Sequence, residues 1–230
     1  MCGRFSLTTP GELIAETFGL EEVPELQPRY NIAPTQPVLA VRLPAPAGDR
    51  ELVPLRWGLL GPGLRDPAQG PPLINARAET AARKPAFREA FRGRRCLVPA
   101  DAFYEWRRSG AQRQPVRYSL TGGSVFALAG LWGPATLPDT GTLGSCVVLT
   151  TEPNALVAEV HDRMPVILPR EAWARWLDPT PASPEELLAL LGTLPAGAMR
   201  ARDVDRAVND VRNDGPECWQ PPREQQQSLF

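Results

Sequence analysis

The chain has 230 residues, of which 43% are hydrophobic and 22% are charged, and its formal net charge is −1 at neutral pH. This length allows one large domain or two small ones with a substantial core, and the composition is that of an ordinary globular protein. No basic leader precedes an apolar run, and no apolar stretch approaches the roughly 18 residues that a membrane span needs. We therefore expect a soluble, cytoplasmic protein without a membrane partner.

The predicted elements are short and are separated by many of the 27 prolines and 19 glycines. In chain order, apolar periodicity and capping residues predict first a helix over 9–18 capped by Thr9, strands over 37–43 and 51–57, and a helix over 85–91. Four strands follow, over 95–99, 115–120, 125–131 and 145–150. The last predicted elements are helices over 153–160, 170–177 and 184–192, and the capping sequence SPEE opens the last of them. This order predicts an α+β fold with a curled, mainly antiparallel β-sheet core. We expect one domain over 1–220 and a disordered tail over 221–230.

The charge is unevenly distributed along the chain. Residues 77–117 carry a net charge of +7, whereas residues 171–230 carry −4. A basic centre in a nearly neutral chain indicates a local site for a polyanion. The cations are 24 arginines and Lys84. Arginine suits phosphate recognition, although high-GC codon usage would produce the same bias.

The four cysteines are Cys2, Cys96, Cys146 and Cys218, and none is close enough to another to form a CxxC pair. With a single histidine in the chain, this spacing predicts no metal site, no cofactor and no disulfide framework. Cys96 and Cys146 lie in apolar, β-branched runs, which predicts that both are buried strand residues.

The N-terminal sequence MCGRF places Cys2 directly after Met1. If Met1 is removed, Cys2 carries a free α-amine beside its thiol, a 1,2-aminothiol that no internal residue can present. An α-amine has a pKa near 7.7–8.0 and a thiol one near 8.5, so both groups are appreciably reactive at neutral pH. Lys84 is the only other amine available for Schiff-base chemistry. The alternative is a small apolar residue near a frayed terminus.

Two further polar residues lie in unusual surroundings. Asn75, in PLINARAET, is either a turn residue or a deliberately placed hydrogen-bonding group, and a turn is the commoner case. His161, in EVHDRMPVIL, follows a short helical segment and is the only side chain whose unperturbed pKa is near neutrality. A lone histidine is usually structural. Arg163 would project to the same side as His161 if this segment is extended.

Glu105 lies among aromatic residues in CLVPADAFYEWRR. Strand alternation places Phe103 and Glu105 on one face, with Tyr104 and Trp106 on the other. A partly desolvated carboxylate has a raised pKa and suits general acid catalysis near neutral pH. The alternative is an ion pair with a following arginine, Arg107 or Arg108.

Eight runs of the sequence are MCGRF, RYNIAPTQ, LRWGLL, NARAET, RCLVPADAFYEW, FALAGLW, VVLTTEPN and HDRMPVIL. Taken together, they resemble the SOS-response-associated peptidase (SRAP) family. Members of that family sense abasic sites and crosslink to DNA through an N-terminal cysteine. The resemblance extends from residue 2 to about residue 218 and includes several motifs in the same order. One departure follows Trp57-Gly58, where family members often have an Ile-Pro-x-Trp-like stretch and this chain has LLGPGLRDPAQGPP.

The resemblance implies a barrel-like fold and a role for each candidate residue. Cys2 would form a thiazolidine with the open-chain aldehyde of an abasic site, in a pocket lined by Asn75, Glu105 and His161. The implied DNA contacts are Arg4, Arg77, Arg163, Asn31, Trp57 and Trp106.

The expected partner is single-stranded DNA that contains abasic sites, bound by a monomer that is nucleoid-associated on DNA. Two other functions stay open. One is an N-terminal-nucleophile peptidase that cleaves itself, with lyase-like activity as a further expectation, and the other is a DNA-binding module without covalent chemistry.

Overall fold

The computed structural model describes residues 2–44, 48–60, 70–110, 112–135 and 144–223. Most of the departure after Trp57-Gly58 (61–69) and most of the expected tail (224–230) lie outside the described residues.

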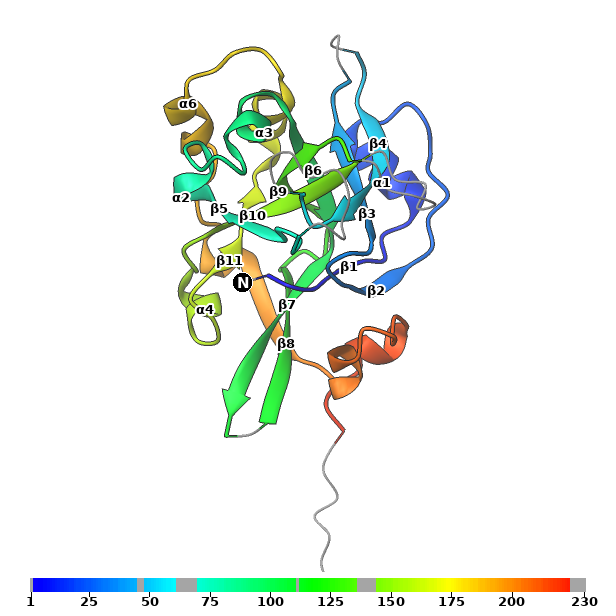
Figure 1. Cartoon of the computed structure of the whole chain (residues 1–230). Helices are drawn as coiled ribbons and strands as arrows, with labels where there is room; N and C mark the ends of the chain where they lie inside the picture. The colour runs from blue at the N-terminus through cyan, green and yellow to red at the C-terminus, as the bar shows by residue number, and fades with distance from the viewer. Residues whose placement is uncertain (1, 45–47, 61–69, 111, 136–143, 224–230) are drawn as a thin grey trace, which may run out of the picture.

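A closed ring of five strands forms the centre of the molecule (Figure 1). β3 (Pro37–Arg42) pairs with β4 (Glu51–Trp57) and β6 (Arg95–Ala100). β9 (Phe126–Gly133) pairs with β6, and β10 (Ser145–Thr151) closes the ring by pairing with both β9 and β4. The β4–β10 pair is parallel and the other four are antiparallel, which confirms the predicted curled, mainly antiparallel core.

This closed ring is called the barrel below. A second sheet of five strands lies beside the barrel, in the order β13 (Met199–Asp203), β8 (Gln112–Leu120), β7 (Ala102–Ser109), β1 (Phe5–Leu7) and β2 (Arg29–Ile32). All of its pairs are antiparallel. The β7–β8 hairpin extends away from the barrel (Figure 1). Because β1 is an inner strand of this sheet, the beginning of the chain is held between β2 and β7.

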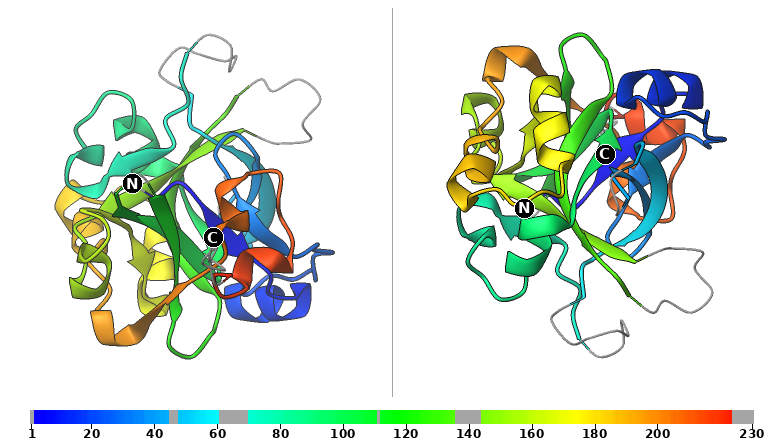
Figure 2. Two further views of the ribbon diagram at one scale, coloured as in Figure 1. Left: turned by 90° about the horizontal axis from the view of Figure 1, so that it is seen from below. Right: turned by 90° about the horizontal axis from the view of Figure 1, so that it is seen from above.

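The other described elements are short and lie around the barrel: α1 (Gly11–Phe18), β5 (Asn75–Arg77), α2 (Ala78–Ala81), α3 (Arg88–Gly93), α4 (Ala155–Ala158), β11 (Met164–Pro165), β12 (Ile167–Leu168), η2 (Arg170–Ala172), α5 (Trp173–Leu177), α6 (Pro184–Ala189), η3 (Ala196–Ala198), η4 (Arg206–Asn209) and η5 (Pro216–Trp219). Seen from below and from above, the C-terminal turns η4 and η5 pack on the side of the molecule that carries α1 (Figure 2). No helix in the described part of the chain is long and apolar enough to cross a membrane.

The predicted strands are confirmed to within a few residues, whereas most predicted helices are shorter than expected. Ser183 and Glu186 form the predicted capping box at the start of α6. The prediction that Thr9 caps the first helix is wrong, because Pro10 occupies the cap position and makes no side-chain cap. Thr9 instead directs its hydroxyl to Asp101 Oδ2 at 3.4 Å.

The turn interpretation of Asn75 is also wrong. Asn75 begins β5, a three-residue strand that pairs in parallel with β10, where Asn75 lies opposite Val148. Local propensity disfavours asparagine in a strand, but pairing with a buried barrel strand overrides that preference here. Cys96 and Cys146 are fully buried in β6 and β10, as predicted.

Arg95 is a buried cation that joins β6 to two helices. Its Nε donates to the carbonyl of Trp176 at 2.6 Å, and its Nη1 donates to the carbonyls of Phe91 at 2.8 Å and Arg92 at 2.5 Å. Nη2 donates to the carbonyl of Asp178. The guanidinium therefore satisfies carbonyl oxygens at the C-terminal ends of α3 and α5, which no intrahelical donor can reach.

We predict that Arg95→Met lowers the free energy of unfolding by about 3–5 kcal/mol, because several buried carbonyls would lose their donor at once. Urea denaturation measures this change. Arg92→Met is the matched control, since the Arg92 side chain is 73% exposed on α3 and should contribute less than about 1 kcal/mol. Equal stability of the two variants would contradict the role given to Arg95.

Candidate functional site

The beginning of the chain is held against β7 by main-chain pairing. Phe5 lies opposite Phe103 in the β1–β7 ladder, and the Tyr104 N–H donates to the Arg4 carbonyl at 3.0 Å. Since the two strands are antiparallel, the residues before Arg4 run along β7 toward Glu105. The start of the chain lies beside β5, β10 and β11 (Figure 1).

Asp101 fixes the other end of β1. Its buried carboxylate accepts hydrogen bonds from the Ser6 hydroxyl at 2.5 Å and from the Thr8 N–H and hydroxyl at 2.5 and 2.8 Å. The Thr9 N–H donates to the same carboxylate at 3.2 Å. Charge-assisted bonds of this kind are strong, so the register of β1 on β7, and with it the position of Cys2, is well determined.

Cys2 is fully buried and is bound to Asn75. The Asn75 Nδ2 donates to the Cys2 carbonyl at 2.7 Å. Burial raises the pKa of the Cys2 thiol well above its usual range, and the nearby Glu105 carboxylate raises it further. The ordinary thiol pKa assumed from the sequence is therefore too low for Cys2. In the folded protein Cys2 holds a protonated thiol, which needs a base before it can act as a thiolate.

Glu105 lies on the face of β7 that its alternation with Tyr104 predicts, and only 3% of it is exposed. Burial raises the pKa of Glu105 to about 7, and the negative charge of Asp162 adds to this shift. Of the two arginines considered as its ion-pair partner, Arg107 instead contacts both carboxylate oxygens of Asp203 at 3.0 Å, and Arg108 lies opposite Arg113 in the β7–β8 ladder. Glu105 can therefore both donate and accept a proton near neutral pH.

His161 follows α4, as expected, and its main-chain N–H donates to the Val157 carbonyl at 2.9 Å. Its Nδ1 accepts a hydrogen bond from the Arg163 N–H at 2.9 Å, which places the proton of the neutral ring on Nε2. Burial lowers the pKa of His161, although the adjacent Asp162 carboxylate, 3.0 Å from Nδ1, opposes this shift. The imidazole is therefore mostly neutral at pH 7.

Arg163 ties the His161 segment to the end of β10. Its Nη2 donates to the Thr150 carbonyl at 2.7 Å and to Glu79 Oε2 at 2.9 Å. Thr150 lies opposite Arg77 of β5 in one ladder and opposite Pro165 of β11 in another. The segment that carries His161 is thus held beside the strand that begins with Asn75.

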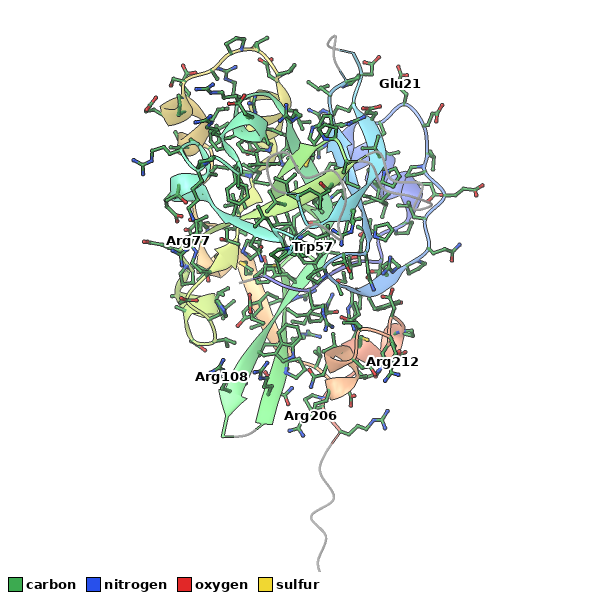
Figure 3. All side chains as sticks on the ribbon, in the orientation of Figure 1. Glu21, Trp57, Arg77, Arg108, Arg206 and Arg212 are labelled. Carbon is green, nitrogen blue, oxygen red and sulfur yellow. The ribbon has the colours of Figure 1, made fainter. Side chains whose placement is uncertain are left out.

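Arg77 is exposed at the C-terminal end of β5, and its side chain lies at the edge of the molecule (Figure 3). It forms no ion pair with any residue in the described ranges. Of the predicted phosphate-binding arginines, Arg77 is accordingly the one whose guanidinium is available without breaking an existing contact, whereas Arg163 is already bound to Thr150 and Glu79.

Arg4 and Asn31 bind the C-terminal segment. Arg4 Nη1 donates to Asn31 Oδ1 and to the Val208 carbonyl, both at 2.7 Å. Asn31 is fully buried, and its Nδ2 donates to the carbonyls of Val208, Asp210 and Asn213 at 2.8–3.1 Å. This burial argues against direct contact of the Asn31 side chain with DNA in this conformation and gives it a supporting role.

The two predicted tryptophans lie in different environments. Trp57 is fully buried inside the molecule (Figure 3), where its Nε1 donates to the Ile74 carbonyl at 2.9 Å and its ring packs on Phe5 at 5.1 Å. Trp57 therefore supports both β1 and the residue before Asn75, and its burial argues against direct contact with DNA. Trp106 is half-buried, and its Nε1 donates to Asn209 Oδ1 at 2.6 Å.

Tyr118 is a neighbour of Glu105 that the sequence did not reveal. It lies on β8 opposite Phe103, stacks on that ring at 5.1 Å, and is fully buried. Burial raises the pKa of Tyr118 to about 12 and the charge of Glu105 contributes to this shift. Only alternation along PVRYSL could have indicated that Tyr118 shares a face with the site.

The structure thus brings Cys2, Asn75, Glu105 and the segment of His161 together from four separate parts of the chain. No three of the histidine, cysteine, aspartate or glutamate side chains in the described part of the chain are grouped so that they could hold a metal ion. What the site offers is a buried cysteine at the start of the chain, an amide bonded to the carbonyl of that cysteine, a carboxyl group with a pKa of about 7, and an imidazole whose pKa is lowered.

Residues 1–211 match the model of the family described as SOS response associated peptidase (SRAP). The chain is a member of the SRAP family. Among its relatives, the abasic site processing protein YoqW of Bacillus subtilis is 40% identical over 94% of this chain and 98% of its own length. The abasic site processing protein YedK of Escherichia coli is 33% identical over 96% of this chain and 100% of its own.

More distant relatives also match almost the whole of this chain. The mouse abasic site processing protein HMCES is 30% identical over 96% of this chain and 76% of its own length. A crystal structure of a protein from Bacteroides thetaiotaomicron superposes with a TM-score of 0.81 at 25% identity, over 96% of this chain and all of that one. Membership of the SRAP family confirms the resemblance inferred from the sequence motifs.

Proposed function

We propose that this SRAP protein recognises abasic sites in single-stranded DNA and binds them covalently through Cys2 after removal of Met1. The observation that carries the proposal is the placement of Cys2, the second residue of the chain, against Asn75 and Glu105 inside the fold. A cysteine at a frayed terminus would be exposed, whereas Cys2 is fully buried. The abasic site processing names of its relatives support the choice of substrate.

The proposed reaction has two bond-forming steps. The α-amine of Cys2 attacks the aldehyde carbon of the open-chain abasic sugar, and loss of one water gives an imine. The Cys2 sulfur then adds to the same carbon, the thiol proton leaves to a base, and the imine nitrogen takes up a proton. The five-membered thiazolidine that results no longer contains the C=N bond that permits β-elimination, so the strand is protected from cleavage.

Glu105 and His161 supply the proton transfers. With a pKa of about 7, Glu105 can protonate the sugar ring oxygen as the ring opens and then, as a carboxylate, accept the proton of the Cys2 thiol. The Nε2–H of His161 donates a hydrogen bond to the hydroxyl that leaves as water during imine formation, and the minority protonated form of the ring supplies the proton. Asn75 holds the Cys2 carbonyl and so orients the amine.

A single strand is the expected substrate because an aldehyde within a stacked duplex can be reached only after the nucleotide is extruded. The amino acids closest to the reacting atoms lie in the interior, so the strand must present the lesion to them. Arg77 and, after rearrangement of their present contacts, Arg4 and Arg163 are the proposed phosphate contacts, with Trp106 as the accessible aromatic side chain.

Intact-mass measurement tests the proposal. The purified protein is mixed with an abasic single strand, with the same strand undamaged, and with a peptide. We expect a species whose mass is that of the chain without Met1 plus the abasic strand minus one water, and no adduct with the undamaged strand. Cleavage of the peptide without a DNA adduct would instead support the peptidase that the family name describes.

We predict that Arg77→Gln weakens binding of undamaged single strands and lowers the slope of log K against log salt by about 0.7, the value for one phosphate contact on a single strand. Fluorescence anisotropy at several salt concentrations measures both. Arg92→Gln removes the same charge from an exposed position on α3 and should leave the slope unchanged. If Arg77→Gln has the wild-type slope, the strand follows another path.

A further inference from the structure

A cavity lies on the opposite side of the β7–β8 pair from Glu105. It has a volume of about 530 Å³ and is bounded by the start of α1, the turn after β8, β13 and η5, with Arg117, Arg200, Ser119, Thr17 and Trp219 among its walls. Arg117 lies opposite Tyr104 in the β7–β8 ladder. Because side chains alternate along a strand, the face that carries Tyr104 and Arg117 is not the face that carries Glu105.

Like charges are concentrated on this face. Arg117 lies directly opposite Arg202 in the β8–β13 ladder, and Arg200 lies opposite Ser119. Arg108 and Arg113 form a second opposed pair nearer the hairpin tip, where Figure 3 labels Arg108. Directly opposed like charges destabilise a sheet. The repeated arrangement therefore costs stability unless an anion is present.

Among the described residues that line the cavity, Asp101 is the only one with a carboxylate, and it is already bonded to Ser6, Thr8 and Thr9. The Asp101 carboxylate therefore mainly accepts the hydrogen bonds that hold β1. Its single negative charge cannot neutralise the two positive charges of Arg117 and Arg200. The buried Nε of Arg117 has no hydrogen-bond partner among the described residues. A buried donor without a partner carries a desolvation penalty that a bound acceptor would relieve.

The arginines are also held in defined positions. The Arg117 guanidinium lies 3.7 Å from the centre of the Trp219 ring, which fixes its plane. Arg200 Nε donates to Ser119 Oγ at 3.2 Å, and this leaves its two terminal nitrogens to other acceptors. A planar guanidinium fork held at the wall of a cavity matches the oxygens of a phosphate group.

We propose that this cavity binds a phosphate group, with Arg117 and Arg200 as its principal ligands. The group comes either from a DNA strand that passes along the row of arginines on β8 and β13 or from a free phosphate-bearing small molecule. The chemistry of recognition is the same in both cases. The site is distinct from the Cys2 site and does not depend on the proposed crosslinking reaction.

Isothermal titration of the full-length protein with inorganic phosphate at low ionic strength tests the proposal. We expect saturable binding with one site in the wild type and in the control Arg92→Gln, and at least roughly tenfold weaker binding in Arg117→Gln and Arg200→Gln, since each loses charge-assisted hydrogen bonds. Circular dichroism checks folding, and Arg200→Gln provides an independent test should Arg117→Gln disturb Trp219. Absence of saturable binding in the wild type, or equal binding in all variants, overturns the proposal.

The two sources are separated with an undamaged oligonucleotide, which cannot crosslink. If phosphate competes with the strand in the wild type and Arg200→Gln weakens strand binding, the cavity holds a strand phosphate. If phosphate binds without affecting the strand, the cavity serves a free anion. Crosslinking of an abasic strand by the wild type is measured separately. A DNA adduct without saturable phosphate binding overturns the phosphate site alone, and phosphate binding without an adduct overturns the crosslinking proposal alone.

Discussion

Cys2→Ala should lose the heat-stable DNA adduct completely, to the level seen with undamaged strands, while still forming an adduct that borohydride can trap. Alanine leaves the α-amine in place, so an imine can form, but without sulfur the thiazolidine ring cannot close. The imine also permits β-elimination, so this variant should cleave part of the abasic strand. Denaturing gels after heating, with and without borohydride, measure all three effects.

The matched control is Cys146→Ala, which removes a thiol of equal burial from β10 without altering the start of the chain. It should crosslink like the wild type. A second control retains Cys2 behind an uncleaved N-terminal tag, which converts the amine to an amide and should abolish both adducts. Heat-stable crosslinking by the tagged protein or by Cys2→Ala would disprove ring closure through the aminothiol.

Glu105→Gln should slow crosslinking at saturating DNA by about 10²–10⁴-fold, the usual contribution of a general acid–base group, with affinity for undamaged strands nearly unchanged. Glutamine keeps the size and much of the hydrogen bonding but can neither deliver nor accept the proton.

In the wild type, the rate of ring opening should fall as pH rises through about 7, because the acid form of Glu105 is then lost. Glu105→Gln should lose this dependence. Single-turnover crosslinking across pH measures both, and a mutant that binds poorly but reacts at the wild-type rate would make Glu105 a DNA contact.

Glu105→Gln should raise the free energy of unfolding above pH 7, although it slows crosslinking. Burial raises the pKa of Glu105 from 4.5 to about 7, so between these values the folded state binds more protons than the unfolded state. The contribution of Glu105 to stability therefore falls as pH rises from about 4.5 to 7, by an amount on the order of 3 kcal/mol. Glu105→Gln removes this cost. It should be more stable than the wild type at pH 8 and similar to it near pH 4, as urea denaturation at the two pH values would show.

Such a pairing of lower activity with higher stability is expected of a residue kept for chemistry. A buried carboxylate that served only the fold would show the reverse, because its replacement would remove favourable contacts. The two measurements on Glu105→Gln therefore distinguish a catalytic role from a structural one without requiring knowledge of the flanking DNA sequence.

The amino-acid sequence by itself determined the class of fold, the position of most barrel strands, and the identity of the candidate nucleophile. Short runs of apolar, β-branched residues such as 145–150 favour a buried strand, because these side chains pack well on a pleated surface and the run is too short for a typical core helix. Alternation alone placed Glu105 and Tyr104 on opposite faces of β7, which the structure confirms.

The shortest strands could not be predicted in this way. β1 and β5 are three residues long, and their strand conformation depends on pairing with β7 and β10, which are distant in sequence. The turn predicted at Asn75 and the cap predicted at Thr9 failed for this reason: each residue is bound to a partner that local propensity does not include.

Only the tertiary structure decided which of the candidate residues can act directly. Asn31 and Trp57 carry family motifs, yet both are fully buried and hold the C-terminal segment and β1 in place. Residue type is written in the sequence, but burial, and with it the protonated thiol of Cys2 and the raised pKa of Glu105, depends on how much of the remaining chain surrounds each group. Desolvation is a property of the packed fold. The aromatic neighbours of Glu105 in the sequence indicated the direction of its pKa shift, but the size of that shift and the protonated thiol of Cys2 depended on the tertiary structure.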